Sequence, residues 1–304
     1  MSGVVVLGIF VADATYRTGR LPRMGETLLG SSFALGPGGK GSNQAVAAAR
    51  AGAEVAMLTR VGRDPFGDMA RAVWAEAGVR PAAGPVDEAT GSACILVDDA
   101  TGDNAIVVAP GAASGIDAAF VDAHADLLRG AAVVMTQLEQ PLDAAMRALA
   151  LGREGGAATI LNPAPAAALP EGMLPLCDYV TPNETEAEAL TGLPVGTEDE
   201  ARAAGERLLA LGVRRGAVLT LGARGALLVT PDGAELVPAR AAGPVVETTG
   251  AGDAFNGGFA AALAEGRSEV EAARFGCAVA GISVTRPGAA ASMPSRAEID
   301  AALG

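Results

Sequence analysis

Histidine is nearly absent from this sequence: His124 is the only one among 304 residues. A metal site built from several imidazoles is therefore excluded, and a Ser–His–Asp triad is disfavoured. His124 lies in the run Asp-Ala-His-Ala-Asp, which is typical of a surface helix, so we do not expect it to be catalytic. Acid–base chemistry in this protein is left to carboxylates and lysines.

Basic residues are also scarce. The chain has 22 lysines and arginines against 35 aspartates and glutamates, which gives a net charge of −13. A nucleic-acid-binding surface needs an excess of positive charge, so we expect no nucleic-acid partner, whereas a nucleotide needs only a local pocket. No apolar run reaches the length of a membrane span, so we expect no membrane partner. The apolar start, Met1–Phe10, is short and lacks a basic leader, and it predicts a first strand rather than a signal.

Cysteines and aromatic residues are the other scarce types. The three cysteines, Cys94, Cys177 and Cys277, lie far apart and form no CxxC motif. This spacing is typical of reduced thiols in the core of a cytoplasmic protein. Aromatic residues make up 3% of the chain, whereas 41 residues are glycine and 50% are hydrophobic. That composition indicates a tightly packed α/β protein with many short turns.

Hydrophobic runs alternate with helical patterns along most of the chain. This alternation predicts an α/β fold of three layers, in which helices cover both faces of a mostly parallel central sheet. We expect a single domain over residues 1–304, with ligands beyond the carboxyl ends of the strands. The expected strands are Val4–Ile9, Val55–Thr59, Ala132–Thr136, Ala157–Leu161, Asp178–Val180 and Ala217–Leu221, and the clearest expected helices are Gly41–Gly52, Pro141–Leu151 and Glu200–Leu211.

Two segments break this alternation. Residues 13–33 carry Pro22 and Gly25 and are expected to be irregular. Ser92–Asp98 and Asn104–Val108 predict a hairpin around a polar, glycine-containing turn. No helix able to form a crossover precedes either segment. We therefore expect residues 11–35 and 92–109 to project from the main sheet as a small lid.

The most informative motif is Glu-Thr-Thr-Gly-Ala-Gly-Asp-Ala-Phe at residues 247–255, which leads into an apolar helical stretch. The first amides of a helix lack intrahelical partners and attract anions, and Gly250 and Gly252 leave the backbone open to one. Asp253, in the first turn, can take a proton from a hydroxyl while the anion pocket holds the group being transferred. The motif indicates phosphoryl transfer to an alcohol, and an ordinary loop with a first-turn acid is the alternative.

A second glycine-rich turn, at residues 35–44, precedes another predicted helix. Three of its glycines satisfy G-x-G-x-x-G, but Pro37 interrupts the turn and the acid expected at the end of the next strand is missing. An NAD-dependent oxidoreductase is therefore disfavoured. The turn is not a Walker loop either, because Gly41 stands where a serine or threonine is required. It presents Lys40 and Asn43, whose donors suit the hydroxyls of a polyol, and a purely structural turn is the alternative.

Three further polar segments follow predicted strands. Asn183 and Glu186 can form a helix capping box, or they can stand at the phosphate and Mg²⁺ end of a nucleotide site. Thr220–Gly225 ends a strand in a glycine turn that suits the floor of a nucleotide site. Glu139 stands at a strand end, where an exposed acid can hold a hydroxyl. Each segment is weak alone, but all are expected at the same edge of the sheet.

With these motifs assembled, the chain resembles the ribokinase-like (PfkB) carbohydrate kinases over nearly its whole length. Gly38–Ala45 is similar to the amino-terminal signature of the family, and Thr249–Phe255 is similar to the carboxy-terminal one. Leu161–Ala166 and Thr181–Glu186 are also similar to segments of the family. The resemblance implies a central sheet with flanking helices, a β lid that closes over the sugar, and a homodimer whose interface the lid often forms.

The resemblance also implies a role for each matching residue. Asp253 matches the general base that deprotonates the sugar hydroxyl, and Gly250, Ala251 and Gly252 match the anion hole for the transferred group. The positions that match the sugar site are Asp13, Gly39, Lys40, Gly41, Asn43 and Glu139. The positions that match the ATP and Mg²⁺ site are Asn183, Glu186, Thr220, Gly222, Gly225 and Gly252, with Cys277 near the adenine. The positions that match the monovalent-cation loop, mostly through backbone carbonyls, are Glu247, Thr249, Ser283, Arg286, Gly288 and Ser292.

Two positions depart from the family pattern. Glu247 stands where aspartate is usual, and its extra methylene can move the carboxylate or loosen the cation site. Val11 stands where members that act on ribose have an asparagine, so a hydrogen-bond partner for one sugar hydroxyl is missing. Sites built to bind a hydroxyl discriminate by a factor of about 10⁴ against analogues that lack it. The change at Val11 therefore relaxes or redirects the choice of sugar.

The resemblance implies ATP-dependent phosphorylation of the exocyclic hydroxymethyl group of a pentose, with D-ribose as the first candidate, Mg²⁺ as the metal and K⁺ as the expected activator. A kinase of the same fold that acts on deoxyribose, a ketohexose or a nucleoside is the nearest alternative. An NAD-dependent oxidoreductase and a sugar sensor without catalytic activity are the remote ones.

Overall fold

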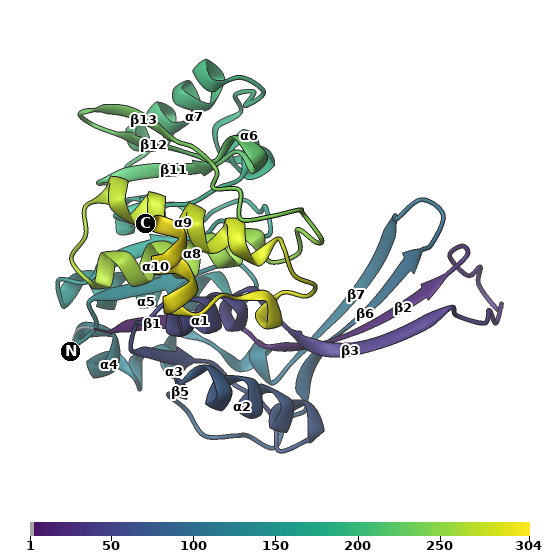
Figure 1. The fold of residues 1–304 in the computed structure, drawn as a ribbon. Coiled ribbons are helices and arrows are strands. Elements are labelled where there is room, and N and C mark those ends of the chain that lie inside the picture. Colours follow the sequence, from purple (N-terminus) through teal and green to yellow (C-terminus); the bar gives the residue numbers. More distant parts are fainter. Residues whose placement is uncertain (1–2) are drawn as a thin grey trace.

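Short apolar runs form the centre of the fold as buried parallel strands. The computed structural model describes residues 3–304, in which nine strands form the main sheet (Figure 1). Their spatial order is β13 (Gly233–Val237), β12 (Ala226–Thr230), β11 (Gly216–Thr220), β10 (Tyr179–Val180), β9 (Ala158–Leu161), β8 (Val133–Thr136), β1 (Val4–Leu7), β4 (Val55–Leu58) and β5 (Val79–Pro81). All neighbours from β11 to β5 are parallel, and β12 and β13 form an antiparallel edge.

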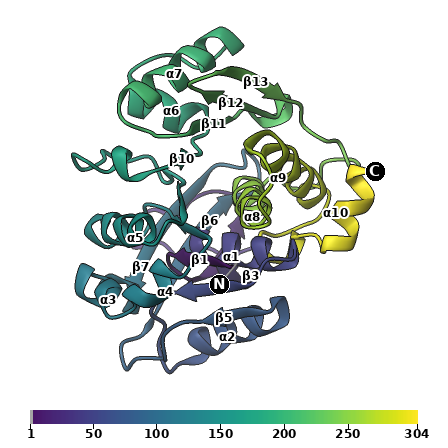
Figure 2. The same cartoon turned by 90° about the vertical axis from the view of Figure 1, so that its left-hand side faces the viewer.

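The central strands are buried on both faces, which makes the molecule three layers deep (Figure 2). Val4 and Val6 of β1 pack into one hydrophobic core, whereas Val5 and Leu7 pack into the opposite one. The first face is covered by α1 (Lys40–Arg50), α2 (Pro65–Ala77), α8 (Ala251–Ala264), α9 (Glu269–Ser283) and α10 (Arg296–Leu303). The second face is covered by α3 (Ala118–Asp122), α4 (Ala125–Arg129), α5 (Leu142–Glu154), α6 (Glu184–Thr191) and α7 (Glu198–Ala210). The predicted α/β fold is confirmed.

A second, four-stranded sheet projects from the main body, and we call it the lid sheet (Figure 1). It consists of β3 (Ser32–Gly38), β2 (Val11–Thr18), β6 (Thr90–Asp98) and β7 (Asn104–Gly111), in that order. The predicted hairpin is present as β6 and β7. The prediction of irregular structure over residues 13–33 is confirmed for residues 19–31 and wrong at both ends, where β2 and the start of β3 lie. The parallel partner of β2 is β6, about eighty residues later in the chain (Ala12 lies opposite Ser92), so no local pattern announces the strand.

The side chain of Asp64 links the start of α2 to the start of β6 in the lid sheet. One carboxylate oxygen accepts a hydrogen bond from Gly67 N at 2.7 Å and caps α2, and the other accepts one from Thr90 N at 2.7 Å, at the start of β6. The Thr90 hydroxyl accepts a hydrogen bond from Gly62 N at 2.8 Å. A single carboxylate thus joins the first turn of a helix to the base of the lid sheet.

We expect Asp64→Ala to lower the free energy of unfolding by about 2 kcal/mol, because it removes a helix cap and a second charge-assisted bond. Burial opposes ionisation of Asp64, but the amides of Thr90 and Gly67 outweigh it and hold the pKa of Asp64 below its usual range. Since the folded state has the lower pKa, the contribution is present above the unfolded-state pKa of about 4 and is lost as the pH falls through the folded value. Urea unfolding of both forms between pH 3 and 7 measures this, with exposed Asp68→Ala as the control. An equal loss at every pH would contradict it.

Two other expectations about scarce residues need correction. Cys177 and Cys277 are buried as predicted, but Cys94 is exposed on β6 of the lid sheet, where one face of the strand has no covering layer. His124 does not lie within a helix, because the chain breaks there between α3 and α4 and its Nδ1 lies 2.8 Å from the carbonyl oxygen of Phe120. Among residues 3–304, none of the helices combines the length and the apolar character that crossing a bilayer requires.

Candidate active site

Helix α8 begins with a glycine turn that has no side-chain cap. Gly250, the N-cap residue, has a φ of 77°, a left-handed conformation that favours glycine. A Cβ there would lie 2.9 Å from the Cβ of Ala289, whereas a Cβ on Gly252 would meet no atom within 4 Å. The amides of Gly252 and Asp253 have no acceptor among residues 3–304. Free amides beside open space at a helix start suit an anion.

Asp253, in the first turn of α8, is a buried carboxylate held by two amides. It is 7% exposed. One of its oxygens accepts a hydrogen bond from Asn43 Nδ2 at 3.0 Å, and the other accepts one from Gln44 Nε2 at 3.0 Å. Burial raises the pKa of Asp253, while the charge of Lys40 and the two amide bonds act in the opposite direction. The arrangement provides a carboxylate with increased basicity at the anion-binding end of a helix.

Helix α1 brings Lys40 and Asn43 to the same place. Gly39, which precedes the helix, has a φ of 88°, and a Cβ on it would lie 2.6 Å from the carbonyl oxygen of Ile9. This close approach seats the start of α1 against the end of β1. The backbone amide of Lys40 donates a hydrogen bond to a carboxylate oxygen of Glu139 at 2.8 Å. Glu139 follows β8, so residues that follow the ends of the neighbouring strands β1 and β8 meet here.

The acids around Lys40 have raised pKa values. Burial raises the pKa of Glu139 to about 7, and the charges of Asp253 and Asp13 add to the effect, although the amide and charge of Lys40 oppose it. Burial raises the pKa of Asp13, on β2, to about 6. The charge of Lys40 therefore acts on Glu139 and Asp253, and Glu139 also lies within the electrostatic range of Asp13. Such perturbed groups gather at functional sites.

This group lies where parallel α/β sheets bind ligands. The strand order passes from β8 to β1 to β4, so the chain leaves β1 for β4 on one side and later returns to β8 on the other. The carboxyl ends of β1 and β8 thus flank the point where the strand order reverses, which is the usual ligand crevice. The structure therefore brings together Asp13, Gly39, Lys40, Asn43, Glu139 and Asp253, as the sequence predicted. Gly41 lies just behind them, where a Cβ would lie 2.7 Å from the Cα of Gly8.

Asn183 and Glu186 form the capping box of α6 that the sequence allowed. Asn183 N donates to a Glu186 carboxylate oxygen at 2.9 Å, and Glu186 N donates to the Asn183 side-chain oxygen at 2.8 Å. Glu186 is 8% exposed, burial raises its pKa, and the charges of Lys40 and Asp253 reach it. The cap thus holds a buried acid within the electrostatic range of the catalytic candidates. A hard oxygen ligand of this kind fits Mg²⁺, which binds through few carboxylates and several waters.

The remaining nucleotide-site candidates lie along β11 and β12. Thr220 N donates to the carbonyl oxygen of Pro182 at 2.9 Å, which places Thr220 beside Asn183. Gly222 and Gly225 have φ values of 55° and 105°, and they shape the turn between the two strands. Cys277, in α9, is buried with its sulfur 3.9 Å from the carbonyl oxygen of Val237, the same carbonyl that a Cβ on Gly225 would strike. Cys277 is therefore a neighbour of Gly225.

The two segments of the expected cation loop lie against each other. Glu247 N donates to the carbonyl oxygen of Val284 at 3.2 Å, and the Glu247 carboxylate accepts a hydrogen bond from Gly288 N at 2.8 Å. The hydroxyls of Ser283 and Ser292 donate to backbone carbonyls of their own turns, and Arg286 forms an ion pair with Glu298. No donor among residues 3–304 bonds the carbonyl oxygens of Thr249, Arg286 or Gly288. These free carbonyls fit a monovalent cation.

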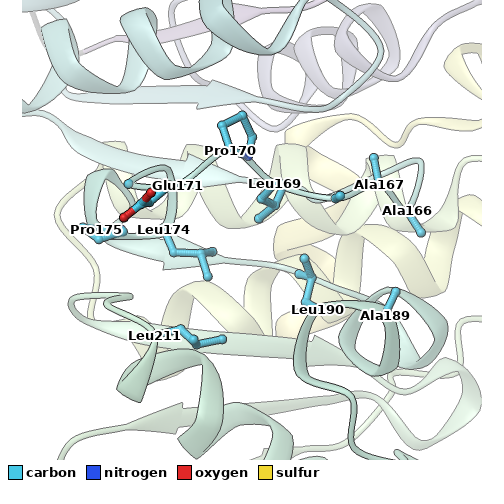
Figure 3. A pocket seen from close by; sticks show the side chains of 12 residues that line it. Ala166, Ala167, Leu169, Pro170, Glu171, Leu174, Pro175, Ala189, Leu190 and Leu211 are labelled. Atoms are coloured by element: carbon cyan, nitrogen blue, oxygen red, sulfur yellow. The ribbon is translucent and has the colours of Figure 1, made fainter.

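A hollow of the described surface lies away from the catalytic group. It has a volume of about 840 Å³ and is lined by the loop 166–175 and the ends of α6 and α7. Figure 3 shows its alanine, leucine and proline side chains, with Glu171 as the acidic one. None of the predicted site residues lines it. Its size therefore carries no argument about the catalytic group.

Sequence reasoning missed the layer of polar side chains behind Asp253. Gln44 Nε2 also donates to the side-chain oxygen of Asn162 at 3.0 Å, and Gln137 Nε2 donates to Gln44 Oε1. Gln44 and Asn162 lie in the motifs at residues 38–45 and 161–166, so the sequence marks their positions. It does not reveal their contacts, because these join residues more than ninety positions apart.

The fold and this site define a class of protein. A model of the pfkB family carbohydrate kinases matches residues 1–296, and the chain belongs to this family. It is an enzyme, a carbohydrate kinase and phosphotransferase of the ribokinase type.

Particular relatives make the similarity specific. The chain is 39% identical over 297 residues to the ribokinase of Haemophilus influenzae, which covers 97% of this chain and 96% of the relative. It is 37% identical over 295 residues to the deoxyribokinase of Salmonella typhi, which covers 96% and 95%. The solved structure of Arabidopsis thaliana ribokinase complexed with ribose and ATP superposes with a TM-score of 0.92 at 31% identity, covering 99% of this chain and 98% of the other.

Proposed function

We propose that this protein transfers the γ-phosphoryl group of ATP to the exocyclic hydroxymethyl group of a pentose, with D-ribose as the first substrate and D-ribose 5-phosphate as the product. The observation that carries the proposal is the buried carboxylate of Asp253 in the uncapped first turn of α8, beside the free amide of Gly252. Relatives named as ribokinases, and a similar structure that holds ribose and ATP, support the choice of substrates.

In the proposed step, Asp253 takes the proton of the sugar hydroxyl. The hydroxyl oxygen forms a bond to the γ-phosphorus, the bond to the β–γ bridging oxygen breaks, and ADP leaves with that electron pair. In the turn of Gly250, Ala251 and Gly252, the free amide of Gly252, together with that of Asp253, stabilises the charge on the transferred group, whereas the Ala251 amide donates to the carbonyl oxygen of Thr248 at 3.1 Å. The raised pKa of Asp253 makes it a better proton acceptor than an exposed aspartate.

The sugar is proposed to lie among Asp13, Asn43 and Glu139. The Asn43 side-chain oxygen is buried without a hydrogen-bond partner, which suits it to accept a bond from a sugar hydroxyl. The amides of Gly39–Gly41 lie at the adjoining start of α1. Closure of the lid sheet over this group excludes water and suppresses hydrolysis of ATP.

The nucleotide is proposed to lie along Asn183, Thr220, Gly222 and Gly225, with the adenine near Cys277. Glu186 would hold Mg²⁺ through water, and the free carbonyls of Thr249, Arg286 and Gly288, with Glu247, would hold K⁺. Mg²⁺ neutralises charge on the phosphate oxygens when it is bound. ATP, a free sugar and the free cysteines of the chain fit a cytoplasmic enzyme.

A second substrate, 2-deoxy-D-ribose, is favoured by Val11. This side chain is 5% exposed at the start of β2, opposite Gly38, and Gly38 lies against the carboxylate of Asp13. An apolar group next to a sugar-binding acid leaves one hydroxyl without a partner. The similarity to a deoxyribokinase is consistent with this reading.

A substrate panel tests the proposed function. ATP turnover with Mg²⁺ and K⁺ is measured against D-ribose, 2-deoxy-D-ribose, other pentoses, fructose and several nucleosides. We expect the highest kcat/KM with one of the first two sugars. A hexose or nucleoside as the best acceptor would replace the substrate but keep the kinase chemistry. No turnover with any acceptor, in a folded protein that binds ATP, would favour a sugar sensor without catalytic activity.

We expect Val11→Asn to raise the ratio of kcat/KM for D-ribose to that for 2-deoxy-D-ribose by at least about tenfold, because it adds a hydrogen-bonding partner for a hydroxyl. Steady-state kinetics with both sugars measure the ratio. The control is Leu236→Asn, at an exposed leucine of the edge strand β13. An unchanged ratio in a folded Val11→Asn variant would remove Val11 from the sugar site.

The protein is also proposed to form a homodimer through the lid sheet. Ile106, Val107 and Val108 are three consecutive exposed residues of the edge strand β7, so apolar side chains stand on both of its faces. Phe33 and Leu35 extend the exposed apolar surface along β3. A second copy of the same sheet would cover this surface.

We expect light scattering to give twice the 30.0 kDa chain mass for the unmodified protein and one chain mass for Val107→Glu. The charge would have to be buried in the interface without a partner. Ala234→Glu, on the exposed edge strand β13, is the control. A dimer that survives Val107→Glu would place the interface elsewhere.

A further inference from the structure

Gln44 contacts Asp253 from inside the protein. It lies in α1, one residue after Asn43, and its side chain is 0% exposed. Its Nε2 group donates to two acceptors, the Asp253 carboxylate and the side-chain oxygen of Asn162, each at 3.0 Å. A fully buried residue of this kind has no route to a substrate. Any effect it has on catalysis passes through Asp253.

The orientation of the Gln44 amide is fixed by its neighbours. Asn162 Nδ2 donates to the backbone carbonyl of Thr181 at 3.1 Å, and a carbonyl can only accept. The Asn162 oxygen must therefore face Gln44, and Gln44 must present its NH₂ group both to that oxygen and to Asp253. On the far side, Gln137 Nε2 donates to Gln44 Oε1. A flipped Gln44 amide would place an oxygen against two acceptors and its NH₂ group against a donor.

The glycines nearby make this contact possible. A Cβ on Gly41 would lie 3.0 Å from Gln137 Oε1 and 2.7 Å from the Cα of Gly8. Side chains at Gly8 and Gly41 would keep Gln137 away from Gln44. The amino-terminal glycine turn therefore serves the polar layer behind Asp253 as well as the front of the site.

Asn43, Lys40 and Gln44 all act on Asp253, but they differ in the other interactions that they make. Asn43 carries an unpartnered buried oxygen and is available to the sugar, so its position depends on what is bound. Lys40 is the cation that reaches Asp253, Glu139 and Glu186 at once, so its charge is shared. All the hydrogen-bonding capacity of the Gln44 NH₂ group is used inside the protein. It is therefore the donor that stays the same when the substrates bind.

We propose that Gln44 is a positioning residue for the base: its amide, held by Gln137 and Asn162, fixes the plane of the Asp253 carboxylate and keeps that carboxylate ready to accept the sugar proton. This inference rests on the proposed role of Asp253. A neutral donor suits this task, because it stabilises the ionised form of Asp253 against burial and leaves the negative charge in place. A second cation would cancel that charge.

The test compares Gln44→Met with the unmodified enzyme. Methionine keeps the approximate size and removes the donor. The measurement is kcat at saturating D-ribose and ATP between pH 5 and 9, with 2-deoxy-D-ribose used if the panel finds it the better acceptor. We call the rise of kcat with pH on the acidic side of the profile the acid limb. We expect this limb to move up by about one pH unit, because a hydrogen bond to the ionised form of Asp253 is lost. The KM for the sugar should change less than about threefold.

Two further variants separate positioning from structure. Gln137→Met frees the Gln44 amide to turn, so we expect a smaller shift of the acid limb in the same direction. If Gln44→Met does not fold, Gln137→Met is used for the test instead. Ser42→Ala removes a buried hydroxyl of the same helix, the acceptor of Trp74 Nε1 at 2.9 Å, without touching Asp253. It should lower the unfolding temperature and leave the limb in place.

The charged and titratable groups facing Asp253 are Lys40, Glu139 and Glu186, and they are the same in all variants. An acid limb that does not move in folded Gln44→Met and Gln137→Met would overturn the inference. A limb that moves equally in Ser42→Ala would do so too. Full activity of Asp253→Asn would instead overturn the proposed role of Asp253, so the two failures are distinguishable.

Discussion

Asp253→Asn should lower kcat by about 10³- to 10⁴-fold, while KM for the sugar changes by less than about threefold. The variant keeps the size of the side chain and removes its ability to take a proton. Asp253 is the carboxylate nearest the open amides of α8, and its neighbours Asn43 and Gln44 are amides that cannot replace it as a base. Steady-state kinetics, together with calorimetric titration of the sugar, separate turnover from binding.

The substitution also has a structural effect that needs a control. Both oxygens of Asp253 accept hydrogen bonds from amides, so the introduced NH₂ group would face a donor on one side and cost about 1–3 kcal/mol of stability. Asp178→Asn is the matched variant, because Asp178 is also buried and accepts a hydrogen bond from Thr159 N at 3.0 Å, but it stands before β10 at the other end of the strands. It should lose stability and keep kcat. Near-normal turnover of Asp253→Asn would remove the general base from the mechanism.

The second large effect is expected from Gly250→Ala, which should lower kcat by about 10²- to 10³-fold, the loss typical of a displaced oxyanion donor. The new Cβ would lie 2.9 Å from the Cβ of Ala289 and require a left-handed φ of 77°, so the first turn of α8 must shift. We expect the free energy of unfolding to fall by about 1–2 kcal/mol as well. Kinetics and thermal unfolding of the same preparation report both changes.

Gly252→Ala is the comparison that identifies the anion. Its Cβ would meet no atom of the protein within 4 Å, and alanine is the better helix former, so stability should stay equal or rise by up to about 1 kcal/mol. Its kcat should nevertheless fall, because the methyl group occupies the space proposed for the transferred phosphoryl group. Full activity of Gly252→Ala would mean that the phosphoryl group binds elsewhere.

The parts of the fold that could be predicted from the sequence are those determined by adjacent residues. Buried strands such as β1, β4 and β8 are uninterrupted apolar runs, and each was predicted to within two residues of its ends. The start of α8 was predicted because a glycine turn, a first-turn acid and an apolar helix follow one another directly. Local chemistry of this kind needs no knowledge of the rest of the chain.

The parts that could not be predicted depend on partners far away in the chain. β2 pairs with β6, and the sequence of neither strand reveals that the other is its partner. The bond from Gln44 to Asp253 joins residues 209 positions apart, and the bond from Gln44 to Asn162 joins residues 118 positions apart. Cys94 was assigned to the core because the three cysteines lie far apart and form no CxxC motif, and only the exposed face of the lid sheet places its thiol at the surface.

That misplaced thiol makes the native chain ready for labelling. Cys177 and Cys277 are buried and burial raises the pKa of each thiol, whereas Cys94 is exposed on the part of the molecule proposed to move. Cys94 lies opposite Val107, so a second copy on the lid sheet would cover it. A maleimide dye should therefore attach at Cys94 alone, and faster in Val107→Glu than in the unmodified protein, so that the rate of labelling reports whether the sheet is covered.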